Sequence, residues 1–198
     1  GHLPQDAATS DLVIVWGRNP KATSLHFYTL LKQAEKKGTR VIVIDPMQSD
    51  TAKSLGTHLR VKPGTDAALA LAMAHVIVAE NLYDRSFVQE HVRGFDRFCN
   101  YLNRFDPENA AMITGLSSGT IRELARDYGN ARAPGIWMGY GLQRYANGGN
   151  TVRSIDALAA VCGHVGKPGT GANYAARSLA PLLNLPENLA VASIVAVG

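Results

Sequence analysis

The chain has 198 residues, of which 46% are hydrophobic and 18% are charged, and its formal net charge is +4. This length suits one domain, and the composition is typical of a globular protein and excludes an intrinsically disordered one. Because the positive charge is spread along the chain without a run of five or more Lys or Arg, we expect no nucleic-acid partner.

Two short runs of apolar, mostly β-branched residues, 13–15 and 41–44, are the first predicted strands. Neither run alternates with polar residues, which is typical of strands buried on both faces of a parallel sheet. Between them, apolar residues recur at helical spacing over residues 23–37. Ligands in such sheets bind beyond the carboxyl ends of the strands. We therefore expect residues 17–19 and Asp45, which follow the two strands, to lie side by side.

The rest of the chain continues the alternation of strands and helices. The sequence predicts a short helix at 49–55, a strand at 58–61, helices at 67–80 and 84–91, a helical or irregular segment at 94–105, a helix at 117–128, a strand at 135–139 and a helix at 151–162. This order predicts a single α/β domain over residues 1–198, a Rossmann-like three-layer fold with a mostly parallel sheet and helices on both faces. The apolar run 189–197 is about half as long as a membrane span, so we expect no direct membrane insertion.

The first candidate site is the turn Gly17-Arg-Asn19-Pro20, where a strand passes into a helix. It is not the GxGxxG dinucleotide fingerprint, but it would place backbone N–H groups at a helix N-terminus, which suits a phosphate. An ordinary turn is the alternative interpretation. Asp45 ends the second strand, where an acid commonly accepts hydrogen bonds from a ribose or base, although it could also serve only as a turn former.

The segment Pro63-Gly64-Thr65-Asp66 comes directly before the most apolar predicted helix. Thr65 or Asp66 could cap that helix, because a short oxygen-bearing side chain satisfies its first free N–H groups. The functional alternative is that the Asp66 carboxylate accepts two N–H donors of a nucleobase such as guanine.

A second loop rich in glycine and asparagine follows the predicted strand at 135–139. Its glycines allow close backbone approach to a ligand, Gln143 can both donate and accept hydrogen bonds, and Arg144 can pair with an anion. No catalytic or metal-binding residue is assigned. The chain has no Ser-His-Asp spacing, HExxH, P-loop or GxSxG, and Cys99 and Cys162 lack the CxxC spacing of zinc or iron–sulfur sites.

Seven segments occur in an order that resembles a known family. They are Trp-Gly-Arg-Asn-Pro, Val-Ile-Val-Ile-Asp-Pro, Lys-Pro-Gly-Thr-Asp-Ala-Ala-Leu, Glu-Asn-Leu-Tyr-Asp-Arg-Ser-Phe-Val, Ile-Thr-Gly-Leu-Ser, Gly-Tyr-Gly-Leu-Gln-Arg-Tyr-Ala-Asn-Gly and Cys-Gly-His-Val-Gly-Lys-Pro-Gly-Thr-Gly. Over about residues 8–175, the chain looks like the central cofactor-binding domain of the prokaryotic molybdopterin oxidoreductases. This is the dimethyl-sulfoxide-reductase superfamily, which includes formate dehydrogenases and nitrate reductases.

The resemblance implies a larger enzyme that carries molybdenum or tungsten on two molybdopterin guanine dinucleotides and performs two-electron oxidation or reduction. The partners would be the remaining domains of that enzyme and iron–sulfur subunits, in the cytoplasm or periplasm of a prokaryote. The residues around the cofactor would be Gly17, Asn19 and Pro20 at the diphosphate, Asp45 at the guanosine, Pro63, Gly64 and Asp66 at the guanine, and Gly139, Gly141, Gln143 and Gly148 at the pterin.

The chain also departs from the family. Members usually have, upstream, an iron–sulfur cysteine motif and a Cys, selenocysteine or Ser that ligates the metal, and a further C-terminal domain closes over the second cofactor. We therefore interpret the chain as a fragment that holds at most part of the cofactor and does not turn over. Two alternatives stay open: a metal-free structural module, as in the large iron–sulfur subunit of respiratory complex I, or an unrelated nucleotide-binding α/β domain, as in thiamine-diphosphate enzymes.

Overall fold

The computed structural model describes residues 3–165 and 171–172. Strands and helices alternate along this part of the chain. In order they are η1 (Pro4–Ala8), β1 (Leu12–Trp16), α1 (Pro20–Thr23), α2 (Leu25–Lys36), β2 (Arg40–Ile44), α3 (Asp50–Ser54), β3 (Thr57–Leu59), α4 (Asp66–Ala79), α5 (Arg85–His91), α6 (Phe95–Leu102), α7 (Pro107–Thr114), α8 (Ser118–Asn130), β4 (Pro134–Met138), η2 (Tyr140–Arg144), α9 (Gly148–Val161) and β5 (Gly171–Ala172).

A sheet with the strand order β3-β2-β1-β4-β5 forms the middle of the domain, and every described pair of strands is parallel. The chain builds outward from β1 to β3 and then returns to place β4 on the other side of β1. Such a reversal of direction opens a crevice beyond the carboxyl ends of the two strands at which it occurs. The topology therefore places the expected binding edge at the ends of β1 and β4.

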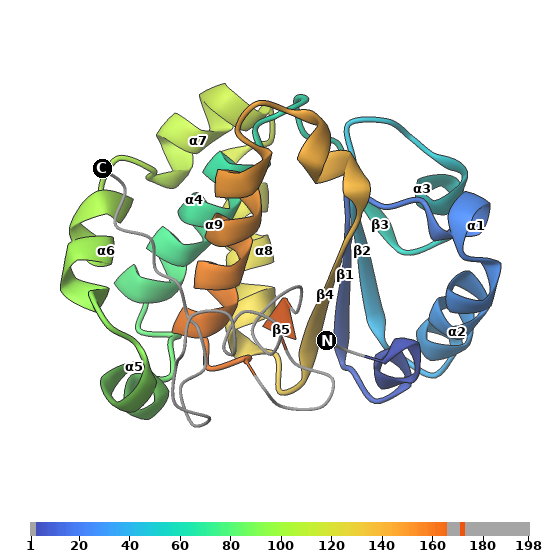
Figure 1. Ribbon diagram of the computed structural model, residues 1–198, viewed down its shortest axis with the longest axis horizontal. Helices are drawn as coiled ribbons and strands as arrows, with labels where there is room; N and C mark the ends of the chain where they lie inside the picture. The colour runs from blue at the N-terminus through green and yellow to red at the C-terminus, as the bar shows by residue number, and fades with distance from the viewer. Residues whose placement is uncertain (1–2, 166–170, 173–198) are drawn as a thin grey trace.

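The side chains of β1 divide the core into two halves. Val13 and Val15 pack with Phe27 of α2, whereas Ile14 and Trp16 pack against α4, α8 and α9. Figure 1 shows α1, α2 and α3 on one face of the sheet and α4, α8 and α9 on the other. Both faces of the central strands are thus covered, as the unbroken apolar runs predicted. The expected three-layer α/β fold is confirmed.

Two helices differ from the predicted ones. The helix expected at 23–37 is α2, and the short helix α1 before it was not predicted; Ser24 leaves the helical region (φ −156°, ψ 68°) and separates the two. Helix α7 was not predicted either: Asp106 accepts a hydrogen bond from the Asn109 N–H at 2.9 Å, and Pro107 takes the first helical position. An Asp-Pro pair fits a turn and a helix start equally well, so the sequence alone did not decide between them.

Other boundaries shift by a few residues. The third strand covers 57–59 rather than 58–61, and α9 begins at Gly148, three residues before the predicted start. The second glycine loop also contains a short 3-10 helix, η2. The apolar run 189–197 lies outside the described residues, and none of the described helices is long and apolar enough to cross a bilayer.

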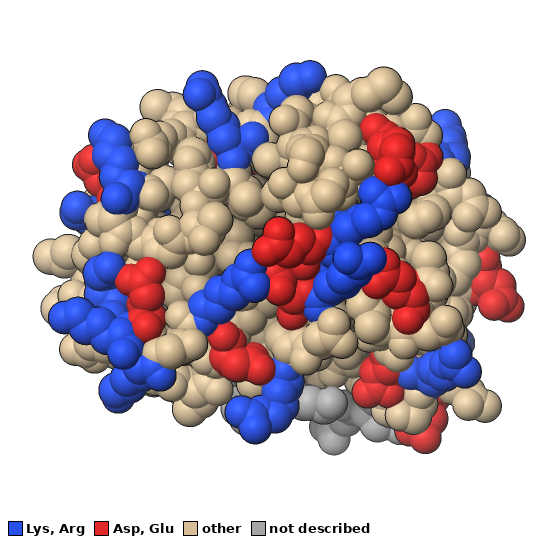
Figure 2. Space-filling view, turned by 180° about the vertical axis from the view of Figure 1, so that it is seen from behind, with Lys and Arg blue, Asp and Glu red and all other residues tan. Residues whose placement is uncertain are grey.

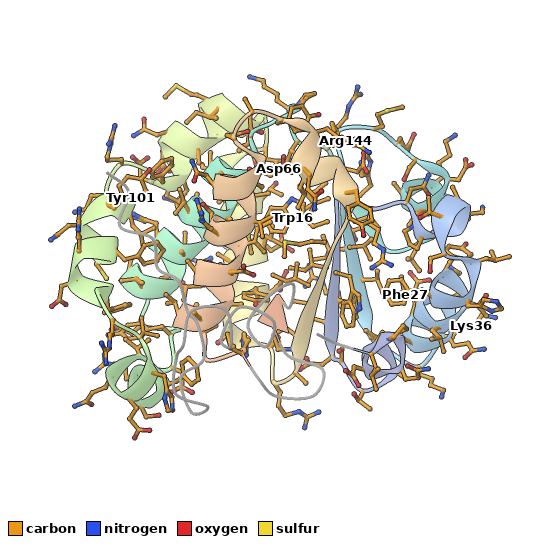
Figure 3. The ribbon with its side chains drawn as sticks, viewed as in Figure 1. Trp16, Phe27, Lys36, Asp66, Tyr101 and Arg144 are labelled. Carbon is orange, nitrogen blue, oxygen red and sulfur yellow. The ribbon has the colours of Figure 1, made fainter. Side chains whose placement is uncertain are left out.

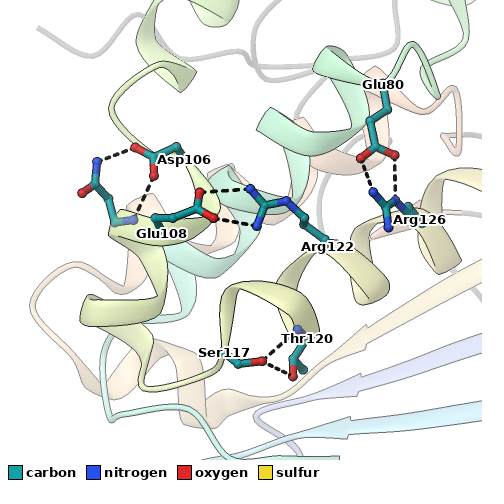
Figure 4. A network of polar contacts seen from close by, with 8 residues as sticks. Glu80, Asp106, Glu108, Ser117, Thr120, Arg122 and Arg126 are labelled. Atoms are coloured by element: carbon teal, nitrogen blue, oxygen red, sulfur yellow. Dashed lines mark hydrogen bonds and ion pairs between the residues drawn. The ribbon is translucent and has the colours of Figure 1, made fainter.

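Ion pairs hold the peripheral helices to the helical layer. Arg122 of α8 makes two hydrogen bonds to Glu108 of α7, and Arg126 makes two to Glu80 just after α4 (Figure 4). Seen from behind, basic and acidic side chains lie intermingled over the surface (Figure 2). Pairs of this kind at the surface contribute little individually, about 0–1 kcal/mol. The buried residues that α4, α7 and α8 share position these helices, and the ion pairs add to this at the surface.

Candidate functional site

The carboxyl ends of β1, β2 and β4 are joined by backbone hydrogen bonds. The Gly17 N–H donates to the Ile44 carbonyl at 2.8 Å, and the Gly139 N–H donates to the Trp16 carbonyl at 2.8 Å. The turn after β1 therefore lies beside Asp45 on one side and beside the second glycine loop on the other. Segments far apart in the sequence meet at one edge of the sheet, at the position where its strand order reverses.

The glycines of the second loop let two loops touch through their backbones. A Cβ atom on Gly139 would lie 2.2 Å from the Gly17 carbonyl oxygen, and one on Gly141 would lie 2.8 Å from the same atom. At Gly148 the nearest atom would be the Leu142 carbonyl oxygen at 2.7 Å. The sequence suggested that these glycines allow a ligand to approach the backbone closely. In the structure they are required because protein backbone packs against them.

Asn19 is oriented by a residue that the sequence did not single out. Its side-chain oxygen accepts a hydrogen bond from the Thr51 hydroxyl at 2.7 Å, and that hydroxyl accepts one from the Lys21 N–H at 3.0 Å. Thr51 is buried at the start of α3. The amide nitrogen of Asn19 has no partner among the described residues, so it presents two N–H donors at the edge of the sheet. Pro20 takes the first position of α1.

Asp45 forms a turn and keeps a second carboxylate oxygen for other contacts. Its Oδ1 accepts a hydrogen bond from the Met47 N–H at 2.8 Å, and its carbonyl lies 2.8 Å from His58 Nε2. Its Oδ2 makes no hydrogen bond within the part of the chain described. The turn-forming interpretation is thus observed, and it does not use up the acceptor capacity of the carboxylate.

The segment before α4 is held to the second loop. Gly64 has φ +77°, a left-handed conformation that glycine adopts without strain. Its carbonyl accepts a hydrogen bond from Asn147 Nδ2 at 3.2 Å, and the ring of Tyr145 lies over it. Pro63, before it, is exposed. The first turns of α4 and α9 therefore lie next to each other at the binding edge.

Asp66 does not cap its helix. Thr65 is the N-cap residue but makes no side-chain capping bond; its hydroxyl donates instead to the Lys62 carbonyl. The Asp66 Oδ1 accepts a hydrogen bond from Trp16 Nε1 at 2.8 Å, and the residue is only 3% exposed. Figure 3 shows the two side chains together between the sheet and α9. The expected capping role is wrong, and the carboxylate instead joins α4 to the end of β1.

The electrostatics of the edge favour an anion. Burial raises the pKa of Asp66, and the hydrogen bond from Trp16 acts in the opposite direction. Arg144 and Gln143 of η2 are exposed, and Figure 3 shows Arg144 beside the ends of the strands. No carboxylate pairs with Arg144 in the described part of the chain. The unpaired guanidinium, together with the N-termini of α4 and α9, suits a phosphate or a similar group.

Comparison with known proteins identifies the family of the chain. A family model described as molybdopterin oxidoreductase matches residues 4–193, almost the whole chain. The chain belongs to the molybdopterin oxidoreductase family. Its glycine turn, Asp45 and second loop are therefore parts of a molybdopterin oxidoreductase domain.

Relatives of this domain are much longer proteins. A probable oxidoreductase of Bacillus subtilis, YyaE, is 41% identical over 174 residues, which are 88% of this chain and 26% of the relative. The F420-dependent formate dehydrogenase 1 subunit alpha of Methanococcus maripaludis is 35% identical over 168 residues, 85% of this chain and 25% of the relative. The structure of acetylene hydratase from Pelobacter acetylenicus superimposes with a TM-score of 0.72 and 26% identity, covering 81% of this chain and 24% of the other. The chain thus spans about a quarter of the length of the relatives it matches.

Metal binding by the described part of the chain would require a cluster of ligating side chains. In residues 3–165 and 171–172 there is no group of three or more His, Cys, Asp or Glu that could bind an ion. Cys162 is buried and Cys99 is half-buried, and burial raises the pKa of both thiols. Cysteines in such surroundings pack as small apolar residues.

Removing the Asp66 carboxylate is expected to destabilise this domain through Trp16. Asp66→Ala leaves the buried indole N–H without an acceptor, which costs about 1–3 kcal/mol of unfolding free energy. Asp66→Asn keeps an oxygen at the same place and should change the stability by less than about 1 kcal/mol. Urea unfolding of both variants at pH 7 measures the difference. Equal stability of the alanine variant and the unsubstituted protein would contradict the structural role of this hydrogen bond.

Proposed function

We propose that this chain is the domain of a molybdenum or tungsten oxidoreductase that binds molybdopterin guanine dinucleotide. Family membership supports the pterin, and the arrangement at the ends of β1 and β4 supports the nucleotide. The observation that carries the proposal is the convergence of the Asn19 amide donors, the free Asp45 oxygen and the start of α4 on one edge of the sheet. The cofactor would supply the metal and the two-electron redox chemistry of the parent enzyme.

The residues at this edge fit a nucleotide that carries a diphosphate. The Asn19 side-chain amide would donate to the diphosphate, and Asp45 Oδ2 would accept from a ribose hydroxyl. Gly64 and Asp66 would lie at the guanine. The loop from Gly139 to Gly148, with Gln143 exposed on it, would face the pterin. Each of these side chains binds or orients the cofactor, and none of them is proposed to react.

The parent enzyme would provide what this chain lacks. We assign no catalytic residue and no metal ligand to the chain, and we propose that it does not turn over by itself. Its partners would be the other domains of the parent protein and iron–sulfur subunits. One relative is named as a subunit alpha, which supports an assembly of several subunits. We propose no nucleic-acid partner and no direct membrane insertion.

A metal-free structural module is the second candidate. Gly139, Gly141 and Gly148 pack against protein backbone, so their presence does not require a ligand. One protein of similar structure is named a hydratase, so the fold by itself does not establish redox chemistry. An unrelated nucleotide-binding domain is disfavoured by the family match over residues 4–193.

Calorimetric titration of the 198-residue chain with GDP and, in parallel, with ADP tests the proposal. We expect GDP to bind in the high micromolar range and ADP at least about tenfold more weakly, a difference of about 1.4 kcal/mol. Asn19→Ala should weaken GDP binding, whereas Asn100→Ala, which changes an exposed asparagine of α6, should not. A folded chain that binds neither nucleotide would support the structural module instead.

A further inference from the structure

A cleft lies among the outer helices, away from the face of α4 that meets Trp16. It has a volume of about 480 Å³ and is lined by residues of α4, α6, α7 and α9. Figure 1 shows α6 standing across from α4 and α9 on the side remote from the sheet. The cleft shares with the nucleotide-binding edge the turn at Gly64 and Thr65 and the side chain of Asn147. Its remaining walls take no part in the function proposed above.

The walls of the cleft are apolar and aromatic. Phe98, Tyr101 and Phe105 line it from α6 and the residues after it, and the rings of Tyr101 and Phe105 lie 5.3 Å apart. Ala68 of α4 and Ala157 of α9 are buried and form part of the floor. Both side chains are short, so a larger side chain at either position would fill part of the cleft. Planar or aliphatic groups of a ligand would find favourable contacts here.

Two arginines give the cleft an uncompensated positive charge. Arg97 of α6 and Arg153 of α9 line it, and no acidic residue of the described part of the chain does. Arg153 reaches only the Asn150 side-chain oxygen at 3.3 Å, and neither arginine pairs with a carboxylate in the described residues. By contrast, Arg122 and Arg126 of α8 each make two hydrogen bonds to a glutamate.

We infer that this cleft binds a small organic anion with an aromatic or aliphatic body. The acidic group would lie at Arg97 and Arg153, whose planar guanidinium groups can donate paired hydrogen bonds to carboxylate, sulfonate or phosphate oxygens. The body would lie among Phe98, Tyr101 and Phe105. The volume is within the roughly 300–1,000 Å³ of small-molecule sites. The inference rests on the walls and charges of the cleft and does not depend on the proposed cofactor.

Fluorescence titration of the 198-residue chain with 8-anilinonaphthalene-1-sulfonate tests the inference, because this probe joins two aromatic systems to an anionic group. We expect saturable binding of one probe per chain. The carboxylate 4-phenylbutyrate should displace it, and the uncharged 4-phenylbutanol should do so at least about tenfold less effectively. GDP should not displace it. Displacement by GDP would place the cleft within the nucleotide site and overturn a separate anion site.

Matched variants separate the cleft from nonspecific binding. Arg97→Gln combined with Arg153→Gln should weaken binding about tenfold or more, and Ala157→Leu, which fills the floor, should do the same. Lys36→Gln combined with Arg132→Gln removes the same charge elsewhere, and Figure 3 shows Lys36 on the opposite layer from Tyr101. This control should bind like the unsubstituted chain. Absence of saturable binding, or equal affinity in the arginine and control variants, would overturn the inference.

Discussion

Replacing Asp156 by asparagine is expected to stabilise the protein at pH 8 and to remove much of its loss of stability between about pH 4 and pH 7. Asp156 lies in α9, and its Oδ1 is buried without a hydrogen-bond partner in the described residues. Burial raises its pKa to about 7. A charged carboxylate in such a place is costly because water no longer solvates it.

The sign of the effect follows from the direction of this shift. An aspartate in the unfolded chain has a pKa of about 3.9, so between about pH 4 and pH 7 the folded state binds the proton more tightly. The contribution to stability is fully present below about pH 4 and is lost as the pH rises through about 7. At about 1.4 kcal/mol per unit of pKa, the expected loss is about 2–4 kcal/mol. An asparagine side chain does not titrate in this range, so the Asp156→Asn variant should not show this loss of stability.

Apart from Asp66 and Asp127, whose pKa values burial also raises, the groups with shifted pKa values do not produce the same slope. Tyr128 and Cys162 contribute to no titration in this range, because burial raises the pKa of both above their ordinary alkaline values. Glu80 and Glu108 have lowered pKa values because arginines hold them, so their contribution is lost only as the pH falls. The raised pKa of Asp66 acts in the same direction as that of Asp156 and stays in the variant.

Urea unfolding at pH 5, 6, 7 and 8 measures the effect in the unsubstituted chain and in Asp156→Asn. Asp96→Asn serves as the control, because Asp96 is exposed in α6 and forms no ion pair among the residues described. We expect the difference in unfolding free energy between Asp156→Asn and the unsubstituted chain to grow as the pH rises. If this difference stayed constant from pH 5 to pH 8, Asp156 would not be the titrating group.

The fold was predictable where the local pattern is strong. The runs at 13–15 and 41–44 are unbroken and apolar, so their burial on both faces followed from the residues alone. The strand order was not predictable in this way. Strand β4 pairs with β1, but the residues of β4 (134–138) do not indicate this pairing over one with an outer strand. Pairing between distant strands depends on the packing of the whole domain, which no short segment encodes.

The candidate site shows the same division. The positions of Gly17 and Asp45 followed from the rule that ligands bind beyond the carboxyl ends of parallel strands. The contact between Trp16 and Asp66 joins residues fifty positions apart, and no spacing rule links them. Thr51 orients Asn19 from another helix and gives no signal in the sequence. Sequence analysis therefore found the residues at the edge but missed the side chains that hold them in place.

Gly139→Ala is expected to lower the stability by about 3 kcal/mol and to abolish binding at the nucleotide edge. The new Cβ would lie 2.2 Å from the Gly17 carbonyl oxygen and 2.7 Å from Arg18 Cα, and both atoms belong to backbone. Relief of this clash requires the ends of β1 and β4 to separate, because the Gly139 N–H bonds to the Trp16 carbonyl. The backbone of Gly139 is extended (φ −113°), so the effect is steric and not conformational.

Gly149→Ala is the matched control for this experiment. Gly149 lies ten positions later in the first turn of α9, and a Cβ there would meet no atom within 4 Å. Alanine in a helix is favoured over glycine by up to about 1 kcal/mol, so this variant should be as stable as the unsubstituted chain or slightly more stable. Thermal unfolding and GDP titration of both variants give the two readouts. If Gly139→Ala matched Gly149→Ala in both, the contact between the two loops would not be what assembles this edge. If Gly139→Ala lost stability but still bound GDP, the contact between the two loops would be needed for stability and not for nucleotide binding.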